Sequence, residues 1–358
     1  MNATHTVVDL DDAEGLLAAD RDGLLRAASM AGAQVRSAAA ALDEGDLDAL
    51  KADQPPRTVI WVAGRGTAER AGAMLAAAVG GAVAAPIVVA PDAPLWIGAL
   101  DVLILAGDDP GDPTLASAAA TAVRRGARVV VVAPFEGPLR DATAGRGVAL
   151  PPRMRVSDDF GLAHYIGAGL AALHAVDPAF QIDLAALADE LDAEALRNSA
   201  ARELFTNPAK TLAERMSGRE VVLAGDTAAT LALARHGAAM LLRVAHRVVA
   251  AVGFADALVA LRDGMGRDPG AGGETALFHD EQIDGPRPTR PRTFVLATDA
   301  LRPVVMARVA GLDDVDVLAA EDVPDVKVPL ASGHPEQQLA MMALRLEMTA
   351  VYLRLVRG

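Results

Sequence analysis

Cysteine is absent from the 358-residue sequence, and aromatic residues make up only 3% of it. Without cysteine the chain has no disulfide, no thiol nucleophile and no thiolate ligand for zinc. The small number of aromatic side chains argues against nucleic-acid recognition by base stacking. The sequence also lacks a basic block, and its formal net charge is -14. We therefore expect no nucleic-acid partner.

Long apolar runs are missing as well. None reaches the roughly 18 residues that a membrane span requires, and the opening MNATHTVVDLDDAEG is too polar and acidic for a signal peptide. We expect a cytoplasmic protein without a membrane partner. No pair of histidines has the spacing of a metal site, and the glycines do not form a dinucleotide-binding motif, so we expect neither a metal nor another cofactor.

What the sequence does contain is a clear β-α-β pattern between residues 102 and 134. The apolar run 102–106 is typical of a strand that is buried on both faces of a sheet. Asp112 and Pro113 occupy the positions of a helix N-cap and first-turn proline, and the helix is predicted over 114–125. A second β-branched run at 128–132 completes the unit. The pattern predicts a parallel sheet with helices on both faces.

The same strand, glycine, hydroxyl and helix order occurs twice, near residue 60 and again near residue 222. We therefore predict two α/β halves, with a helical connection and helices at both ends of the chain. The predicted strands are 58–63, 82–90, 102–106, 128–132, 220–224, 293–298 and 315–319. The predicted helices are one or two within 8–48, then 67–79, 114–125, 159–176, 184–205, 208–216, one from about 228, 302–310 and 335–356.

Two turns after predicted strands are candidate ligand loops. Gly64, Arg65, Gly66 and Thr67 precede a helix, where a phosphate could bind, but a plain tight turn capped by Thr67 is an equal alternative. The turn 107–114 contains three aspartates, and these would satisfy the helix donors and repel a phosphate. For that turn we favour a purely structural role.

Three further positions are candidates for chemistry. Paired prolines rigidify the chain before Arg153, which would lie near a cleft between the halves or simply on a surface linker. The Gly- and Pro-rich stretch 263–292 contains Glu274, His279 and Glu281, either an acid–base group for proton transfer or a solvated acidic loop. His334 precedes the last helix, and we favour a helix-capping role for it over a ligand-binding role.

These features resemble one family, the bifunctional phosphoglucose/phosphomannose isomerases, which are double sugar-isomerase (SIS) proteins. The resemblance covers most of the chain and implies two flavodoxin-like three-layer αβα domains with parallel sheets. It implies domains at 1–150 and 216–358, joined by a helical connection at 151–215. The matching stretches are TVIWVAGRGTAERAG (58–72), PLWI (94–97), 102–134, PPR (151–153), VVLAGDTAAT (221–230) and 338–358.

The resemblance implies isomerisation of glucose 6-phosphate or mannose 6-phosphate to fructose 6-phosphate through an enediol, without a metal. Arg153 would stabilise the enediolate. Glu281 or Glu274 would move the proton, and His279 or His334 would help to open the sugar ring. The implied substrate-binding residues are Gly64, Arg65, Gly66, Thr67, Gly111, Thr114, Thr227 and Lys327.

Two departures from the family favour a second hypothesis, a non-catalytic SIS protein that binds a carbohydrate derivative. The family's Ser-Gly-Asn-Thr phosphate loop is replaced by the acidic stretch 107–113, where only Gly111 clearly survives. Its Glu-x-Asn-His-Asn-Glu stretch corresponds only to TALFHDEQIDG (275–285). We therefore expect weak or absent isomerase activity. A homodimer is a further expectation, because family members pair and the alanine-rich last helix offers an apolar face.

Overall fold

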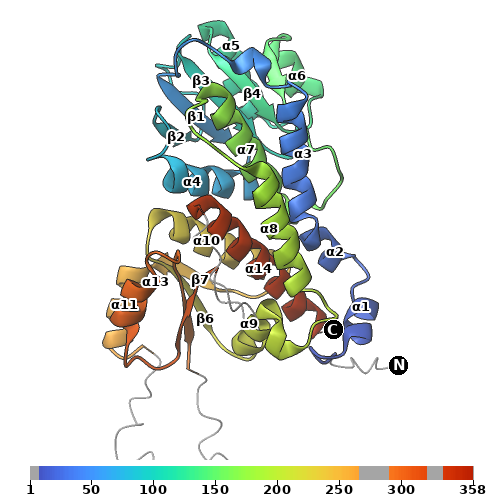
Figure 1. Cartoon of the computed structure of the whole chain (residues 1–358), viewed down its shortest axis with the longest axis vertical. Coiled ribbons are helices and arrows are strands. Elements are labelled where there is room, and N and C mark those ends of the chain that lie inside the picture. The colour runs from blue at the N-terminus through green and yellow to red at the C-terminus, as the bar shows by residue number, and fades with distance from the viewer. Residues whose placement is uncertain (1–7, 266–289, 321–333, 358) are drawn as a thin grey trace, which may run out of the picture.

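The computed structural model describes residues 8–265, 290–320 and 334–357, and every structural statement below concerns those residues. They form two α/β units, each built on a parallel sheet. Several helices lie between the two sheets, as Figure 1 shows. The prediction of an α/β fold with two parallel sheets is confirmed.

The first sheet lies within residues 58–149 and has the order β2-β1-β3-β4-β5. Its strands are β1 (Thr58–Ala63), β2 (Ile87–Ala90), β3 (Asp101–Ala106), β4 (Arg128–Val132) and β5 (Gly147–Ala149). Every residue of the central strand β3 is buried. Burial on both faces explains why its sequence is a continuous apolar run rather than an alternation.

Helices cover both faces of this sheet. On one face α5 (Pro113–Arg125) and α6 (Gly137–Thr143) pack against side chains such as Leu103 and Val131. On the other face α4 (Thr67–Val79) and α7 (Leu162–Val176) pack against side chains such as Trp61. The unit therefore has the three layers that the sequence predicts.

The second sheet repeats this logic with the order β7-β6-β8-β9. Its strands are β6 (Val221–Gly225), β7 (Ala250–Gly253), β8 (Arg292–Leu296) and β9 (Val315–Leu318). One face is covered by α11 (Phe254–Arg262) and α13 (Arg302–Val309). The other is covered by α10 (Ala228–Arg243) and α14 (Pro335–Leu355), which belong to the large core between the sheets.

Helix α14 occupies the middle of that core, and every residue from Gln338 to Leu353 is buried. A helix that is buried all round packs within its own chain and leaves no free face. The prediction that this helix offers an apolar surface for a homodimer is therefore wrong. None of the helices in the described ranges is long and apolar enough to span a membrane.

The remaining helices flank the core on one side. They are α1 (Ala13–Ala19), α2 (Leu24–Ser29), α3 (Ala31–Asp43), α8 (Leu184–Arg197) and α9 (Pro208–Met216), and α3 packs against α7 and α8. The sequence predicts only one or two helices before residue 48. The break comes where the Asp20 carboxylate accepts from the backbone N–H groups of Leu24 and Leu25, and Gly23 has a φ of 67°.

Three other predictions need correction. The strand predicted at 82–90 is confined to Ile87–Ala90, because the Ala84 N–H donates to Asp177 and Pro86 has no N–H to donate. The passage 137–155, for which the sequence predicts no strand or helix, contains α6 and β5. Strand β7 and helix α11 occupy residues for which the sequence predicts no element.

Candidate functional site

The candidate site lies where the chain order of the first sheet reverses, between β1 and β3. Ligands of doubly wound sheets bind beyond the carboxyl ends of such strands. Here the Gly64 N–H donates to the Ala106 carbonyl oxygen at 2.7 Å. A Cβ on Gly64 would lie 3.5 Å from the Gly107 Cα. The two glycines thus let the two loops come together at the sheet edge.

The first loop leads into α4 and holds Gly64, Arg65, Gly66 and Thr67. Gly66 has a φ of 85°, a conformation that favours glycine. The Thr67 side chain is 4% exposed, and its hydroxyl donates to the Asp158 carbonyl oxygen at 3.4 Å. The cap of α4 is Gly66, so Thr67 is a buried first-turn residue. Its hydroxyl contacts the connection between the two units.

The second loop leads into α5, and its carboxylates bond its own backbone. The Thr114 N–H donates to Asp112 Oδ1 at 2.8 Å, and the Gly111 N–H donates to Asp109 Oδ1 at 2.7 Å. The predicted N-cap at Asp112 is confirmed. Because a carboxylate already occupies the N-terminus of α5, this terminus is a poor receptor for a phosphate dianion.

Two cavities open at these loops. The larger, which we call the switch-point cavity, has a volume of about 880 Å³ and is lined by both loops, the end of β2 and Arg243 of α10. The smaller, the connection cavity, has a volume of about 420 Å³ and is lined by residues 134–136, 151–156 and the start of α7. Asp108, Asp158 and Tyr165 line both cavities and mark the boundary between them.

Arginine side chains gather around the first loop of the switch-point cavity. Arg65 is exposed, and Arg243 reaches in from the second unit and pairs with Asp159 at 2.5 Å. A Cβ on Gly66 would lie 3.6 Å from Arg243 Nη1 and 4.0 Å from Arg70 Nη2. Burial, and then the charge of Arg243, lower the pKa of Arg70. Its buried Nε and Nη2 have no hydrogen-bond partner in the described part of the chain.

Carboxylates also line the cavity, and Asp158 precedes Asp159, the ion-pair partner of Arg243. Asp108 and Asp158 are both exposed, and neither makes a side-chain hydrogen bond or ion pair within the described ranges. Partial desolvation raises the pKa of Asp158, and the charges of Asp108 and Asp159 add to that effect, while Arg243 opposes it. Burial and the same two cavity carboxylates, Asp108 and Asp158, raise the pKa of Tyr165. The surroundings of Asp108 and Asp158 are therefore unfavourable for further negative charge.

His164 lies in the wall of the connection cavity. It is 9% exposed, its ring centroid is 5.4 Å from that of Tyr165, and its Nε2 has no hydrogen-bond partner among the described residues. Burial lowers the pKa of His164 to about 4, so the ring is neutral at pH 7. The sequence suggests a structural role for this histidine. Its place in the cavity wall makes it a candidate ligand-contacting residue as well.

Arg153 also lines the connection cavity, together with Pro151 and Pro152. Its guanidinium binds Glu44 through Nη1 at 3.0 Å and Nη2 at 2.5 Å, and it binds Asp46 at 2.9 Å. Hydrogen bonding to Glu44 raises the pKa of Arg153 and lowers that of Glu44. The predicted catalytic arginine is thus held by two carboxylates next to α3.

Of the other predicted site residues that the structure describes, Thr114 lines the switch-point cavity, whereas Gly111, Thr227 and His334 line neither cavity. Thr227 caps α10, where its hydroxyl accepts from the Thr230 N–H at 3.2 Å. His334 is the N-cap residue of α14, and its side chain is 73% exposed. Glu274, His279, Glu281 and Lys327 lie outside the described residues. In the ranges that are described, no group of three or more His, Asp or Glu side chains is arranged to hold a metal.

Sequence reasoning missed Asp158, Tyr165 and Arg243 as candidate site residues. Asp158 and Tyr165 lie in the connection, and Arg243 ends a helix of the other unit, so no local pattern places them beside Gly66.

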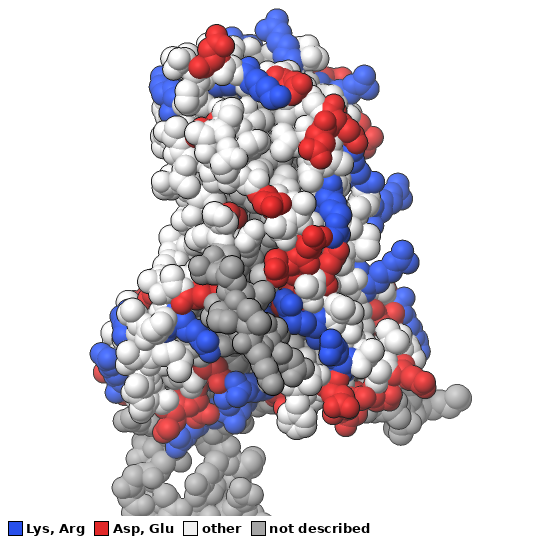
Figure 2. All heavy atoms as spheres, in the orientation of Figure 1, with Lys and Arg blue, Asp and Glu red and all other residues white. Residues whose placement is uncertain are grey.

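The two signs of charge are interspersed on the face that Figure 2 shows, with no continuous basic stripe there.

Several solved structures share this fold over nearly the whole chain. A candidate phosphosugar isomerase from Clostridium difficile 630 matches with a TM-score of 0.65 and 12% identity, over 94% of this chain and 93% of that one. The tagatose-6-phosphate ketose/aldose isomerase from Escherichia coli matches with a TM-score of 0.59 and 14% identity, over 99% and 96%. A glucose-6-phosphate isomerase like protein from Thermus thermophilus matches with a TM-score of 0.55 and 19% identity, over 98% of this chain and 94% of that one.

These structural likenesses establish that the chain has the two-unit SIS fold of phosphosugar isomerases. At such low identities they establish the fold alone. No protein-family model matches the sequence, and no curated protein matches it.

Proposed function

We propose that this chain is a phosphosugar isomerase-like protein that binds a sugar derivative in the switch-point cavity. The observation that carries the proposal is the cavity itself. It lies at the carboxyl ends of β1 and β3, where doubly wound folds bind ligands, and has room for a sugar phosphate at about 880 Å³. Gly66, Thr67, Arg65 and Arg243 line this cavity and supply a backbone turn, a hydroxyl and two guanidinium groups.

The reaction we propose is aldose–ketose isomerisation of glucose 6-phosphate or mannose 6-phosphate to fructose 6-phosphate. In this proposal the phosphate binds beside Arg65 and Arg243. Arg153 would stabilise the enediolate oxygen, and either Glu274 or Glu281 would carry the proton between C1 and C2. His279 or His334 would assist ring opening.

Non-catalytic binding of a carbohydrate derivative is the second candidate function, and two observations favour it. Asp112 caps α5 where the isomerases of the resembling family have a phosphate loop. The Arg153 guanidinium is already paired with Glu44 and Asp46. Both features weaken the interactions that an isomerase needs in the transition state.

A turnover assay separates the two functions. The protein is incubated with glucose 6-phosphate or mannose 6-phosphate, and fructose 6-phosphate is measured over time, with Arg153→Ala as the matched variant. We expect weak or absent turnover with retained binding. Robust turnover that Arg153→Ala abolishes would exclude the non-catalytic function, and absence of binding by any sugar derivative would contradict both functions.

A further inference from the structure

Arg70, in α4, is a partly buried arginine that the fold leaves without a partner. Its buried Nε and Nη2 atoms donate no hydrogen bond, and its side chain forms no ion pair, in the ranges that the structure describes. A guanidinium group carries five N–H donors and stays charged in proteins. Burial of such donors without partners costs free energy, so a fold that keeps them calls for an explanation, and a bound anion is one.

A second positive charge lies close to Arg70. Arg243, at the end of α10, places its Nη1 atom 3.6 Å from the point where a Cβ on Gly66 would lie, and Arg70 Nη2 is 4.0 Å from the same point. Burial is the larger cause of the lowered pKa of Arg70, and repulsion by the charge of Arg243 adds to it. Among the described residues, Asp159 is the one carboxylate that pairs with either guanidinium group, and it binds Arg243 through Nη2.

Gly66 is the point at which both guanidinium groups approach the switch-point cavity. Gly66 and Arg243 line this cavity, whereas Arg70 does not. The backbone at position 66 has a φ of 85°, which favours glycine, and glycine leaves open the space that a side chain would fill against the two arginines. An anionic group in the cavity can therefore approach Gly66 and, after a rotation of the flexible Arg70 side chain, bind both guanidinium groups.

We propose that Arg70 and Arg243 together bind the phosphoryl group of the ligand beside Gly66, so that the ligand joins α4 of the first unit to α10 of the second. This inference rests on the proposed function and adds a binding residue, Arg70, to its site. A phosphoryl group has three acceptor oxygens and can accept from two guanidinium groups that come from different helices, whereas a carboxylate has two and is matched by one. Binding satisfies the unpaired donors of Arg70 and offsets the repulsion between the two arginines.

The variant Arg70→Met tests this inference in the full chain, because it replaces the guanidinium group with an unbranched apolar side chain. Calorimetric titration with fructose 6-phosphate and with inorganic phosphate should show affinities lower by about tenfold or more, since a charge-assisted contact is lost, and the affinity for fructose should not change. The Tm of the ligand-free variant should equal or exceed that of the wild type, because an unpaired buried charge is removed. Arg125→Met, at an exposed position on α5, is the control and should change neither affinity.

A double variant tests whether the two arginines bind the same group. Residues that contact one ligand group depend on each other, so the loss of fructose 6-phosphate affinity in Arg70→Met with Arg243→Ala should differ at least about twofold from the product of the two single losses. Arg125→Met combined with Arg243→Ala should show the product of the single effects. Independent losses from Arg70 and Arg243 would mean that they bind different groups and would overturn the shared site.

The outcomes distinguish this inference from the proposed function. If Arg70→Met binds fructose 6-phosphate as the wild type does, the role of Arg70 is wrong and the proposed function stands. If the Tm of the free variant falls while the affinities stay the same, Arg70 is structural and the inference is again wrong. Equal losses for fructose and fructose 6-phosphate would show that Arg70 acts through the shape of the cavity. If the wild type binds no sugar, no sugar phosphate and no inorganic phosphate, both the inference and the proposed function are wrong.

Discussion

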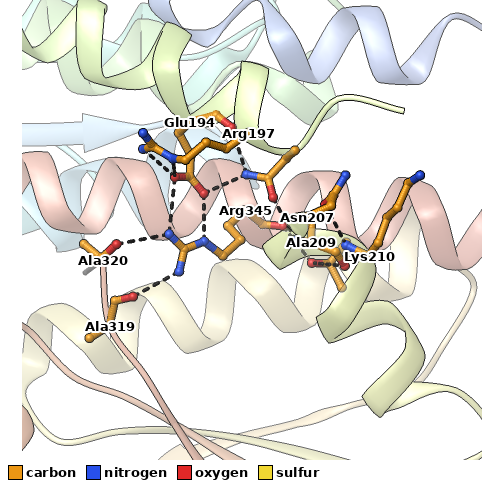
Figure 3. Close-up of polar contacts among 10 residues, drawn as sticks. Glu194, Arg197, Asn207, Ala209, Lys210, Ala319, Ala320 and Arg345 are labelled. Carbon is orange, nitrogen blue, oxygen red and sulfur yellow. Dashed lines mark hydrogen bonds and ion pairs between the residues drawn. The ribbon is translucent and has the colours of Figure 1, made fainter. Parts of the chain in front are cut away.

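Arg345 of α14 donates hydrogen bonds to both carboxylate oxygens of Glu194 on α8, through Nε at 2.7 Å and Nη2 at 3.3 Å. The two side chains are 3% and 0% exposed. Arg345 also donates to the carbonyl oxygens of Ala319 and Ala320 at 3.0 and 3.2 Å, just after β9 (Figure 3). One buried ion pair thus joins the central helix, the connection helix and the second sheet.

Removal of one partner of this pair should strongly destabilise the fold. Arg345→Met would leave the buried Glu194 carboxylate with only the Arg197 guanidinium and the Asn198 amide as partners among the described residues, and such changes cost about 3–5 kcal/mol. Urea unfolding followed by circular dichroism measures the loss. The control is Arg36→Met, which breaks exposed ion pairs with Asp189 and Asp192 and should cost at most about 1 kcal/mol. Equal losses in the two variants would contradict a structural role for the buried pair.

The Arg345–Glu194 pair also makes the free energy of unfolding depend on pH in the acidic range. Burial alone would raise the pKa of Glu194, but the charges and hydrogen bonds of Arg345 and Arg197 outweigh it and hold the pKa below its ordinary value near 4.5. As the pH falls, Glu194 therefore takes up a proton at a higher pH in the unfolded chain than in the folded chain. The contribution to stability is complete above about pH 4.5 and is lost as the pH falls through the lowered value. Glu194→Gln should unfold more easily at pH 7 and show a shallower loss below pH 4.5; an unchanged slope would contradict this.

His164 should affect stability in a higher pH range. Burial lowers its pKa from 6.5 to about 4. Between these values the unfolded chain binds the proton and the folded chain does not, so stability rises with pH from about 4 to 6.5 and is complete above it. A difference of this size corresponds to roughly 3 kcal/mol. NMR titration of the ring measures the pKa directly, and a value near 6.5 would show that the ring is not buried.

The two carboxylates that hold Arg153 should weaken the binding of an anionic ligand to this arginine. Glu44→Gln removes one of the two carboxylates that hold this guanidinium in the wall of the connection cavity and leaves Asp46, so the affinity for an anionic sugar derivative should rise several-fold. The control is Asp43→Asn, which removes a charge from the last residue of α3. Asp43 makes no ion pair within the described ranges. Calorimetric titration compares the variants. If both behave like the wild type, Arg153 acts as a tether between α3 and the connection.

Arg243 is the residue through which the second unit reaches the site. Arg243→Ala should lower the affinity for phosphorylated sugars about tenfold, because it removes a charged contact. It should barely change the affinity for unphosphorylated sugars. Arg235→Ala, an exposed position on the same helix α10, should leave both unchanged. A similar loss for phosphorylated and unphosphorylated sugars would mean that Arg243 acts through the shape of the cavity.

The sequence predicts the parallel-sheet core well because the physics there is local. The buried run of β3, the Asp112 cap with Pro113, and Asn207 with Pro208 at the start of α9 each specify an element from neighbouring residues. β5 and β7 are harder, since they are short sheet-edge strands with three and four residues. Their pairing partner, more than their own composition, makes them strands.

The site is predicted only in part, for a related reason. Sequence patterns identify the loop from Gly64 to Thr67, which does line the switch-point cavity. They cannot show that Arg243 and Asp158 meet that loop, because the packing of α10 against α4 brings Arg243 there and the contact of the turn Asp158–Phe160 with α4 brings Asp158. Nor do they show that Arg153 would be paired with Glu44, a residue far away in the chain.

The most direct test of ligand binding at the switch point is a thermal-shift titration of the wild type and Thr67→Ala. The ligands are glucose 6-phosphate, fructose 6-phosphate and mannose 6-phosphate, beside their unphosphorylated forms. A ligand that binds only the folded state adds about 2.7 kcal/mol of stability at a hundredfold excess over its Kd. We expect a rise in Tm with at least one phosphorylated sugar and a smaller rise in Thr67→Ala. The same Tm with and without every sugar would contradict a sugar-binding function.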